Sequence, residues 1–266
     1  MQASADQPAD RGTDTASFGY REVPADEKAS MVGDVFRSVA SRYDIMNDLM
    51  SAGIHRIWKD RFVTALRPRA GEAFLDLAGG TGDIAERILR RTEHRDHDRL
   101  PESDTAVTLC DINEAMVVAG RDRMIDRGRL NGIRWTVGDA EQLPFADASF
   151  DAVTIAFGIR NVTRIDRALR DIRRVLRPGG RFFCLEFSHV MPALKPFYDT
   201  YSFQVLPRLG AMVAGDREAY QYLAESIRRF PPAPDFEAMI VDAGFRRTGH
   251  EMLTGGIAAI HRGRRI

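Results

Sequence analysis

One short stretch, Phe74 to Asp83, constrains the fold of this chain more than any other part of its sequence. Its residues are FLDLAGGTGD: an apolar run ends in a glycine-rich turn, and a helical pattern follows at Ile84, Ile88 and Leu89. Glycine suits such a turn because the backbone takes a positive φ there and because a ligand approaches it closely. A strand, a tight loop and a helix start in this order are typical of the first βα turn of a nucleotide-type α/β sheet.

The charges beside this loop indicate the kind of ligand. A dinucleotide site usually has the spacing GxGxxG and places a diphosphate at the helix N-terminus. Here the glycines Gly79, Gly80 and Gly82 lack that spacing, and carboxylates flank them at Asp76 and Asp83. Acidic groups repel a diphosphate and suit a cation, and S-adenosylmethionine (SAM) carries a sulfonium and an ammonium group. We therefore predict a SAM site that includes these residues; a glycine turn that serves only chain reversal is the alternative.

Five strand candidates that alternate with helical segments predict the sheet. They are Ala73 to Leu77, Ala106 to Cys110, Ile133 to Val137, Ala152 to Phe157 and Arg181 to Phe187. Such alternation is typical of a parallel sheet with helices on both faces. Two further runs, Phe245 to Thr248 and Gly256 to His261, are too close for a helical crossover and should pair antiparallel. We expect an open α/β sheet of seven strands with an antiparallel strand near its end.

The chain divides into a tail and one domain. Residues 1–17 are polar and lack the pattern of a signal peptide, so we expect a disordered tail before a domain that spans 18–266. Apolar residues at helical spacing predict that 18–70 form a helical extension before the first strand. The aromatic-rich segment 189–230 is too long for a simple connection, and we interpret it as a helical cover over the substrate rather than an ordinary helical excursion. The charged segment 90–104 should be a solvated insertion.

Composition excludes several classes of function. Basic and acidic residues both number 38, so the formal net charge is zero, which argues against a dedicated nucleic-acid binder. The sequence has no run of about 18 apolar residues that would span a membrane. The two cysteines, Cys110 and Cys184, lie in apolar runs and should be buried free thiols of a reducing compartment. No cysteine and histidine cluster has the spacing of a zinc site, so we predict no metal.

Ligands of open α/β sheets bind outside the carboxyl ends of the strands, so the residues there are the candidates. The second strand leads to Asp111, which can accept from both ribose hydroxyls of an adenosine group; a helix cap is the alternative. Asp139 and Ala140 follow the third strand, where a carboxylate beside a small residue can accept from the adenine amino group. Arg160 and Asn161 follow the fourth strand and should face the reaction centre; an arginine paired with a surface acid is the alternative.

These residues lie in longer stretches that resemble the UbiE-type ubiquinone/menaquinone biosynthesis C-methyltransferases. The resemblance is carried by YDIMNDLMSAGIHRIW (43–58), LDLAGGTGD (75–83), CDIN (110–113), DAEQLPF (139–145), FGIRNVT (157–163), RVLRPGGRFFCLEFS (174–188), YLAESI (222–227) and the tail 259–263. The first and sixth of these segments are the most specific. The chain departs from the family at Ala156, where serine is frequent, and in the insertion 90–104.

The resemblance implies a Rossmann-like, seven-stranded SAM-dependent methyltransferase fold, with SAM as co-substrate. It also implies that Thr81, Asp111, Asp139 and Ala140 contact SAM. The substrate would be a polyprenylated quinol, either 2-polyprenyl-6-methoxy-1,4-benzoquinol or demethylmenaquinol, methylated on a ring carbon.

The resemblance further supports proton removal from the quinol through a water that Arg160 and Asn161 hold, and we expect Tyr43 to help close the site. Because the polyprenyl tail lies in the bilayer, we expect a cytoplasmic protein that meets the inner membrane peripherally, through the region Met191 to Arg229. A quinone-biosynthesis complex is a further implication, and a homodimer stays open.

Two rival functions also stay open. A NAD-dependent oxidoreductase needs a diphosphate cradle, which the acid-flanked loop lacks. A non-catalytic SAM-binding scaffold would keep Asp111 and the glycine loop but would not need Arg160 and Asn161.

Overall fold

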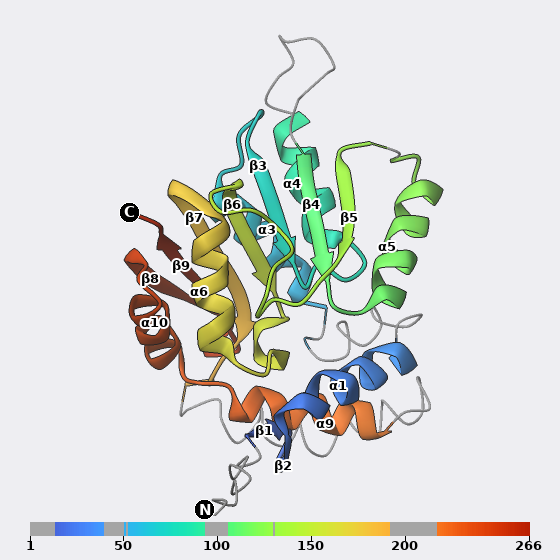
Figure 1. Ribbon diagram of the computed structural model, residues 1–266, viewed down its shortest axis with the longest axis vertical. Coiled ribbons are helices and arrows are strands. Elements are labelled where there is room, and N and C mark those ends of the chain that lie inside the picture. The colour runs from blue at the N-terminus through green and yellow to red at the C-terminus, as the bar shows by residue number, and fades with distance from the viewer. Residues whose placement is uncertain (1–13, 40–50, 52, 94–105, 130, 192–216) are drawn as a thin grey trace, which may run out of the picture.

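The structure, a computed structural model drawn in Figure 1, describes residues 14–39, 51, 53–93, 106–129, 131–191 and 217–266. Its strands and α-helices, in chain order, are β1 (Thr15–Phe18), β2 (Arg21–Pro24), α1 (Ala25–Val39), α3 (His55–Leu66), β3 (Ala73–Leu77), α4 (Asp83–Glu93), β4 (Ala106–Asp111), α5 (Glu114–Asp126), β5 (Ile133–Val137), β6 (Phe150–Ala156), α6 (Ile165–Val175), β7 (Leu176–Phe187), α9 (Arg217–Arg229), α10 (Ala233–Asp242), β8 (Arg246–Leu253) and β9 (Ala258–Arg264). Two 3-10 turns, Ile159–Asn161 and Thr254–Gly256, complete the set.

Seven strands form one open sheet in the order β5-β4-β3-β6-β7-β9-β8. The first five of these run parallel, whereas β9 is antiparallel to both of its neighbours. This arrangement confirms the predicted fold class. The bounds of β7 differ from the prediction, because the strand begins at Leu176, which pairs with Phe150 before the register shifts and Ala152 pairs with Arg181.

Side chains of the strands alternate between two apolar layers, one on each face of the sheet. On one face, residues of α3 and α4 share a core with Phe74 and Phe183. On the other face, residues of α6 and α10 share a core with Leu75 and Phe182. Figure 1 shows α6 and α10 in front of the sheet and α3 and α4 behind it. The two layers fix the sheet rigidly, so the loops at its ends have a firm base.

A hairpin and two helices lie beyond the carboxyl ends of the parallel strands (Figure 1). Strands β1 and β2 pair antiparallel and lead into α1, which contacts α9. The ring of Phe18 in β1 stacks on Tyr222 of α9 with 4.3 Å between centroids. The sequence predicted helices in this extension but not the hairpin, which begins at Thr15, inside the segment that we expected to be a tail.

Parts of two predicted segments lie outside the described residues: 192–216 of the expected substrate cover and 94–104 of the charged insertion. Among the residues that the structure does describe, no helix is both long enough and apolar enough to cross a bilayer. Cys110 and Cys184 are free and buried, as the sequence predicted.

Candidate functional site

A cavity of about 250 Å³ opens at the carboxyl ends of the central strands, between their loops and α1. Five predicted site residues line it: Gly80, Asp111, Asp139, Ala140 and Asn161. Five others lie outside the lining: Asp76, Gly79, Thr81, Gly82 and Arg160. Tyr43 lies outside the described residues. The strands therefore bring Asp111, Asp139, Ala140 and Asn161 to one cavity, whereas Arg160, which was also expected to face the reaction centre, is not part of its lining.

The described lining of this cavity is acidic. It carries the carboxylates of Asp26, Asp111, Asp139 and Glu141 against a single arginine, Arg164. Arg164 is itself neutralised, since it lies 2.7 Å from a carboxylate oxygen of Asp14 and 3.5 Å from one of Glu141. Such a lining attracts a cation and repels a phosphate. Within the described ranges, no three His, Cys, Asp or Glu side chains converge as metal ligands would.

The glycine loop takes the conformations that its sequence predicted. Gly80 and Gly82 have φ values of +53° and +82°, where a side chain would be strained. At Gly79 a Cβ would lie 2.6 Å from the side chain of Leu109, so the loop packs directly on β4. The N–H of Gly80 donates to Oδ2 of Asp111 over 2.9 Å. Loop and acid are thus held as one unit at the cavity wall.

Asp111 keeps at least one acceptor position for a ligand. Its Oδ2 accepts from the N–H of Gly80 and its Oδ1 from that of Asn113, each over 2.9 Å. The N–H of Ile112 acts on the same carboxylate, and because a carboxylate offers about four acceptor positions, at least one remains for a hydroxyl donor in the cavity. Burial raises the pKa of Asp111, and the backbone hydrogen bonds act against that rise. The residue is not a helix cap, because Asn113 caps α5 with its own side chain.

Asp76 lies beneath the loop and is buried. The hydroxyl of Thr154 donates to its Oδ1 over 2.9 Å, and the N–H of Ala85 donates to its Oδ2 over 3.2 Å. Burial raises the pKa of Asp76 to about 7. The hydroxyl of Thr81 accepts from Arg123 of α5 over 3.0 Å. Both residues therefore bond to the scaffold around the loop, and their contact with SAM stays a prediction.

Asp139 and Ala140 line the cavity from the loop after β5. Asp139 is exposed, and its Oδ1 accepts from the N–H of Glu141 over 2.9 Å. That bond is local to the loop and leaves the second oxygen for a ligand. Ala140 is buried and small, so it leaves room beside the carboxylate.

Arg160 lies behind the lining in a buried ion pair. Its Nη1 donates to Oε1 of Glu186 over 2.7 Å and to the carbonyl of Phe157 over 2.6 Å, and its side chain is 4% exposed. Burial raises the pKa of Glu186, while Arg160 opposes that rise. We expected the guanidinium to face the reaction centre or to pair with a surface acid. It pairs instead with a buried acid at the end of β7.

Asn161 lines the cavity, and Tyr222 of α9 orients its amide. The hydroxyl of Tyr222 donates to Oδ1 of Asn161 over 3.1 Å, which leaves the Nδ2 group to donate elsewhere. Tyr222 is 4% exposed, and burial raises its pKa, so the hydroxyl keeps its proton at neutral pH. The covering helix therefore sets which end of the amide faces the cavity.

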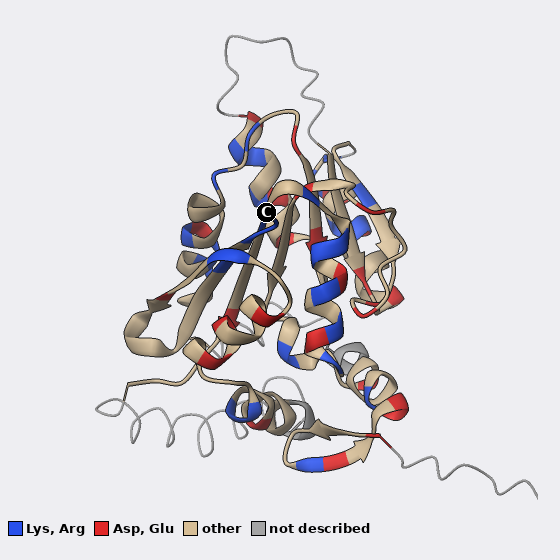
Figure 2. Cartoon of the chain, turned by 60° about the vertical axis from the view of Figure 1, so that its left-hand side comes forward, with Lys and Arg blue, Asp and Glu red and all other residues tan. Residues whose placement is uncertain are grey.

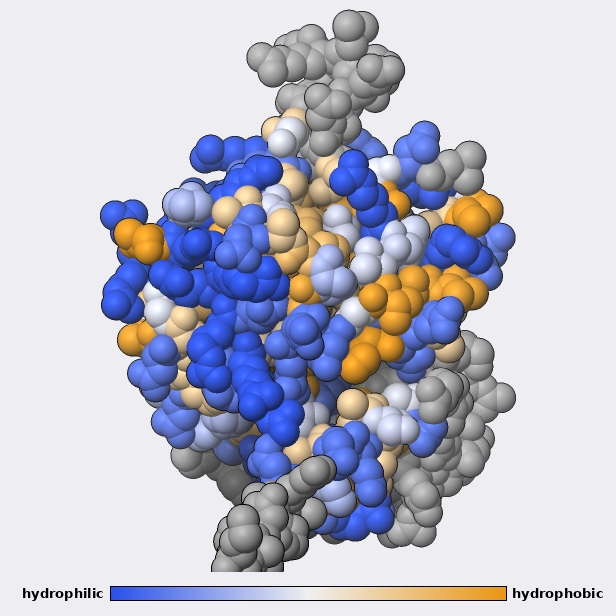
Figure 3. Space-filling model, in the orientation of Figure 1, coloured by the Kyte–Doolittle hydropathy of each residue, from blue (hydrophilic) through white to orange (hydrophobic). Residues whose placement is uncertain are grey.

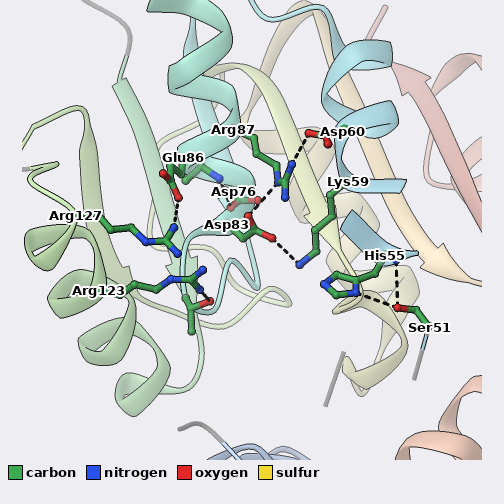
Figure 4. Close-up of polar contacts among 12 residues, drawn as sticks. Ser51, His55, Lys59, Asp60, Asp76, Asp83, Glu86, Arg87, Arg123 and Arg127 are labelled. Atoms are coloured by element: carbon green, nitrogen blue, oxygen red, sulfur yellow. Dashed lines mark hydrogen bonds and ion pairs between the residues drawn. The ribbon is translucent and has the colours of Figure 1, made fainter. Parts of the chain in front are cut away.

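A second polar network joins the glycine loop to α3 (Figure 4). Lys59 donates to Oδ2 of Asp83 over 2.7 Å, and Arg87 donates to Oδ1 over 3.0 Å. Arg87 also pairs with Asp60 of α3. Burial acts to raise the pKa of Asp83, but the two cations outweigh it and lower the pKa to about 2. Asp83 is therefore ionised but neutralised by its partners, and it adds little negative charge to the cavity.

Comparisons with known proteins agree with this geometry. The model of the ubiE/COQ5 methyltransferase family matches residues 16–265. The chain belongs to the ubiE/COQ5 methyltransferase family. It is 55% identical over 257 residues to the ubiquinone/menaquinone biosynthesis C-methyltransferase UbiE of Methylobacterium nodulans, and the match covers 95% of this chain and 97% of that protein. It is 52% identical over 259 residues to the mitochondrial 2-methoxy-6-polyprenyl-1,4-benzoquinol methylase of Oryza sativa subsp. japonica, covering 94% of this chain and 88% of that one.

Solved structures show the same fold as this ubiE/COQ5 chain. A SAM-dependent methyltransferase from Thermotoga maritima has a TM-score of 0.60 at 17% identity, covering 88% of this chain and 99% of that one. A SAM-dependent methyltransferase from Aquifex aeolicus has a TM-score of 0.56 at 13% identity, and the match covers 78% of this chain and 89% of that one. The family and the fold together confirm a SAM-dependent methyltransferase.

Three residues of the ubiE/COQ5 site were not assigned a role from the sequence. Glu186 was detectable in part, because a carboxylate within the otherwise apolar run from Phe182 to Phe187 must find a buried partner. Tyr222 and Lys59 gave no such signal, since their contacts join elements 61 and 24 residues apart along the chain.

Proposed function

We propose that this protein transfers the methyl group of SAM to a ring carbon of a polyprenylated quinol, either a methoxy-benzoquinol or a demethylmenaquinol. The names of its relatives support this substrate class. The observation that carries the proposal is the acidic cavity, where Asp111 with an open acceptor position faces the same space as Asn161. A cationic methyl donor and a neutral quinol suit such a space.

The cavity residues fit the donor. Asp111 would accept from the ribose hydroxyls, and Asp139 would accept from the adenine amino group beside Ala140. Gly80 allows the backbone to approach the ligand, since no side chain stands between them. When bound, SAM supplies an electrophilic methyl group.

The chain must then make the quinol carbon nucleophilic. A ring carbon beside a hydroxyl becomes nucleophilic when that hydroxyl loses its proton, so the protein has to stabilise an oxyanion and help a proton leave. The Nδ2 group of Asn161 would donate to that oxygen or to a water, which its position in the cavity lining and its bond to Tyr222 support. Arg160 adds positive charge behind it, partly offset by Glu186 at 2.7 Å. Asn161 is the group that touches substrate, and Arg160 positions and polarises its surroundings.

We further propose that the protein works at the surface of the inner membrane, on its cytoplasmic side, because the polyprenyl tail of its substrate lies in the bilayer. Exposed apolar side chains near the carboxyl ends of the strands support this. Ile112 follows β4, Val137 ends β5, and Met191 follows β7. Figure 3 shows hydrophobic residues, in orange, gathered over the part of the molecule where Figure 1 draws α5 and β5.

The test is incubation of the protein with labelled SAM and each quinol, followed by mass spectrometry of the lipid. We expect the wild type to add one methyl group to a quinol ring carbon. Asn161→Ala should lower the rate at least about a hundredfold, the scale of one lost oxyanion donor, with SAM affinity within a few-fold of wild type.

Tyr222→Phe is the matched variant, since it keeps the ring and removes only the hydroxyl that orients Asn161. We expect a smaller loss of rate, about tenfold. Near-normal turnover of Asn161→Ala would remove Asn161 from the mechanism, and absence of any methylated quinol from the wild type would overturn the proposed function.

A further inference from the structure

A second hollow, of about 580 Å³, lies at the end of the sheet opposite the acidic cavity. The C-terminal part of α3, the segment after it, and strands β7, β8 and β9 form its walls. The strand pairing of Arg181, which lines the hollow, shows at which end of the sheet the hollow lies. Arg181 pairs with Ala152 near the start of β6 and with Arg264 at the end of antiparallel β9. The hollow is therefore at the amino ends of the parallel strands.

Seven arginines line this hollow, which we call the arginine groove. Two of them are neutralised by carboxylates: Arg61 lies 2.9 Å from Glu251, and Arg181 makes hydrogen bonds of 2.8 and 2.7 Å to Glu72. The Nε of Arg181 is buried without an acceptor among the described residues. Among the described residues of the groove, seven guanidinium groups against these two carboxylates leave an excess of five positive charges.

Four arginines of the groove have no charged partner: Arg67, Arg69, Arg247 and Arg262 are exposed, and their side chains make no ion pair or hydrogen bond with any described residue. Other exposed arginines, such as Arg90, Arg134 and Arg167, also lack a charged partner among the described residues, but none of them lines this hollow, where four such arginines lie together. The whole chain has no net charge, so the groove is a local concentration of positive charge. Figure 2 shows basic residues on the strand that leads to the C-terminus.

Converging guanidinium groups select a compact anion with several oxygens. Each guanidinium presents a planar fork that binds phosphate with two parallel hydrogen bonds. The mutual repulsion of unpaired arginines in one hollow is relieved when an anion enters. Buried Leu66 and Phe183 add an apolar floor beside the charges. A chain of phosphates, free or attached to a nucleoside, fits both features.

We propose that the arginine groove binds a water-soluble di- or triphosphate. A membrane surface is a less suitable partner for the groove, because the groove faces away from the cavity that a lipid-borne quinol has to enter. The hollow shape also suits a small ligand better than a flat partner surface.

The test is calorimetric titration of the full chain with inorganic tripolyphosphate at low salt. We expect binding at one site with a dissociation constant below about 1 mM. The double variant Arg247→Gln/Arg262→Gln should weaken this binding at least tenfold. Arg121→Gln/Arg170→Gln removes the same charge from exposed sites on α5 and α6, and should change the affinity less than twofold. Thermal unfolding checks that both variants fold, and SAM affinity should be unchanged in both.

A second experiment, vesicle binding with phosphatidylglycerol in the membrane, distinguishes a free phosphate ligand from a lipid headgroup. We expect the groove variant to retain vesicle binding. Tripolyphosphate binding that is absent in the wild type, or equally lost in both double variants, would overturn the proposal. Vesicle binding lost only in the groove variant, with tripolyphosphate affinity unchanged, would overturn it in favour of a membrane surface.

Discussion

Asp76 and Asp83 lie at the two ends of one loop, but their surroundings shift their pKa values in opposite directions. Burial raises the pKa of Asp76 to about 7, because its partners are a hydroxyl and a backbone N–H. Asp83 is also largely buried, but Lys59 and Arg87 outweigh that burial and lower its pKa to about 2. The two acids thus differ in charge because Asp83 has two cationic partners, Lys59 of α3 and Arg87 one turn further along α4, whereas Asp76 has none among the described residues.

We predict that Asp83 stabilises the fold in a pH-dependent way. Its folded pKa of about 2 lies below the ordinary value of 3.8, so the folded state binds fewer protons between these values. The contribution is fully present above about pH 4, amounts to about 2 kcal/mol, and is lost as the pH falls toward 2. Asp83→Asn should lower the free energy of unfolding in urea by about this amount at pH 7.

The difference between wild type and Asp83→Asn should then shrink from pH 4 to pH 2. Asp60→Asn is the control, because Asp60 pairs with the same Arg87 but its side chain is 62% exposed, and it should cost less than about 1 kcal/mol. A difference for Asp83→Asn that stays constant with pH would contradict the assigned pKa.

At the scale of elements, the sequence predicts the bounds of those strands that are determined by the local residue pattern. β3 and β5 match the expected bounds because each is a short run, mostly of apolar or β-branched residues, that is followed by a glycine-containing turn. β7 does not, because Pro178-Gly179-Gly180 looks like a break, yet the N–H of Gly179 bonds to the carbonyl of Arg265 over 2.6 Å. That pairing is made by a segment far along the chain, which no local pattern encodes.

In the candidate site, too, some features follow from the local sequence and others depend on residues far along the chain. Asp111, Asp139 and Asn161 were predictable, since each follows a strand whose carboxyl end must face the ligand. The direction of the Arg160 side chain was not, because Glu186 lies 26 residues away on the neighbouring strand. Position along a strand is a local property, whereas side-chain direction depends on which partner the fold brings near.

We predict that the packing of α5 on the glycine loop controls SAM affinity. A Cβ at Gly120 would lie 2.9 Å from the carbonyl oxygen of Gly80 and 3.0 Å from Cα of Thr81, so Gly120→Ala must displace the loop backbone or the helix. Calorimetry should show SAM binding weakened at least about tenfold, and unfolding should show a loss of about 1–3 kcal/mol. Arg121→Ala, an exposed change on the same helix, should leave both unchanged. Gly120→Ala with wild-type SAM affinity would show that the loop adapts.

At the scale of the whole molecule, the two ends of the sheet differ in character. The carboxyl end holds the acidic cavity, and most of the exposed large apolar side chains that the structure describes lie near it, among them Ile57, Ile112, Val137, Met191 and Met252. The amino end holds the arginine groove. A protein that takes a quinol from the bilayer should present its cavity end to the membrane. The exposed apolar side chains support this orientation, because they lie mainly at that end.

We therefore predict that vesicle binding depends on the cavity end alone. Ile57 and Ile266 are both 67% exposed, but Ile57 lies at the cavity end and Ile266 at the other. In flotation with phospholipid vesicles, Ile57→Asp/Met191→Asp should reduce the bound fraction at least about tenfold, since each apolar side chain buried in the bilayer contributes about 1.5–3 kcal/mol. Asp is tolerated at position 57 because it lies in the first turn of α3, where a negative charge stabilises a helix.

Ile266→Asp/Val241→Asp introduces the same charge at the opposite end and should bind like the wild type. Equal loss in both double variants would mean that charge alone, and not the orientation of the molecule, governs its contact with the membrane.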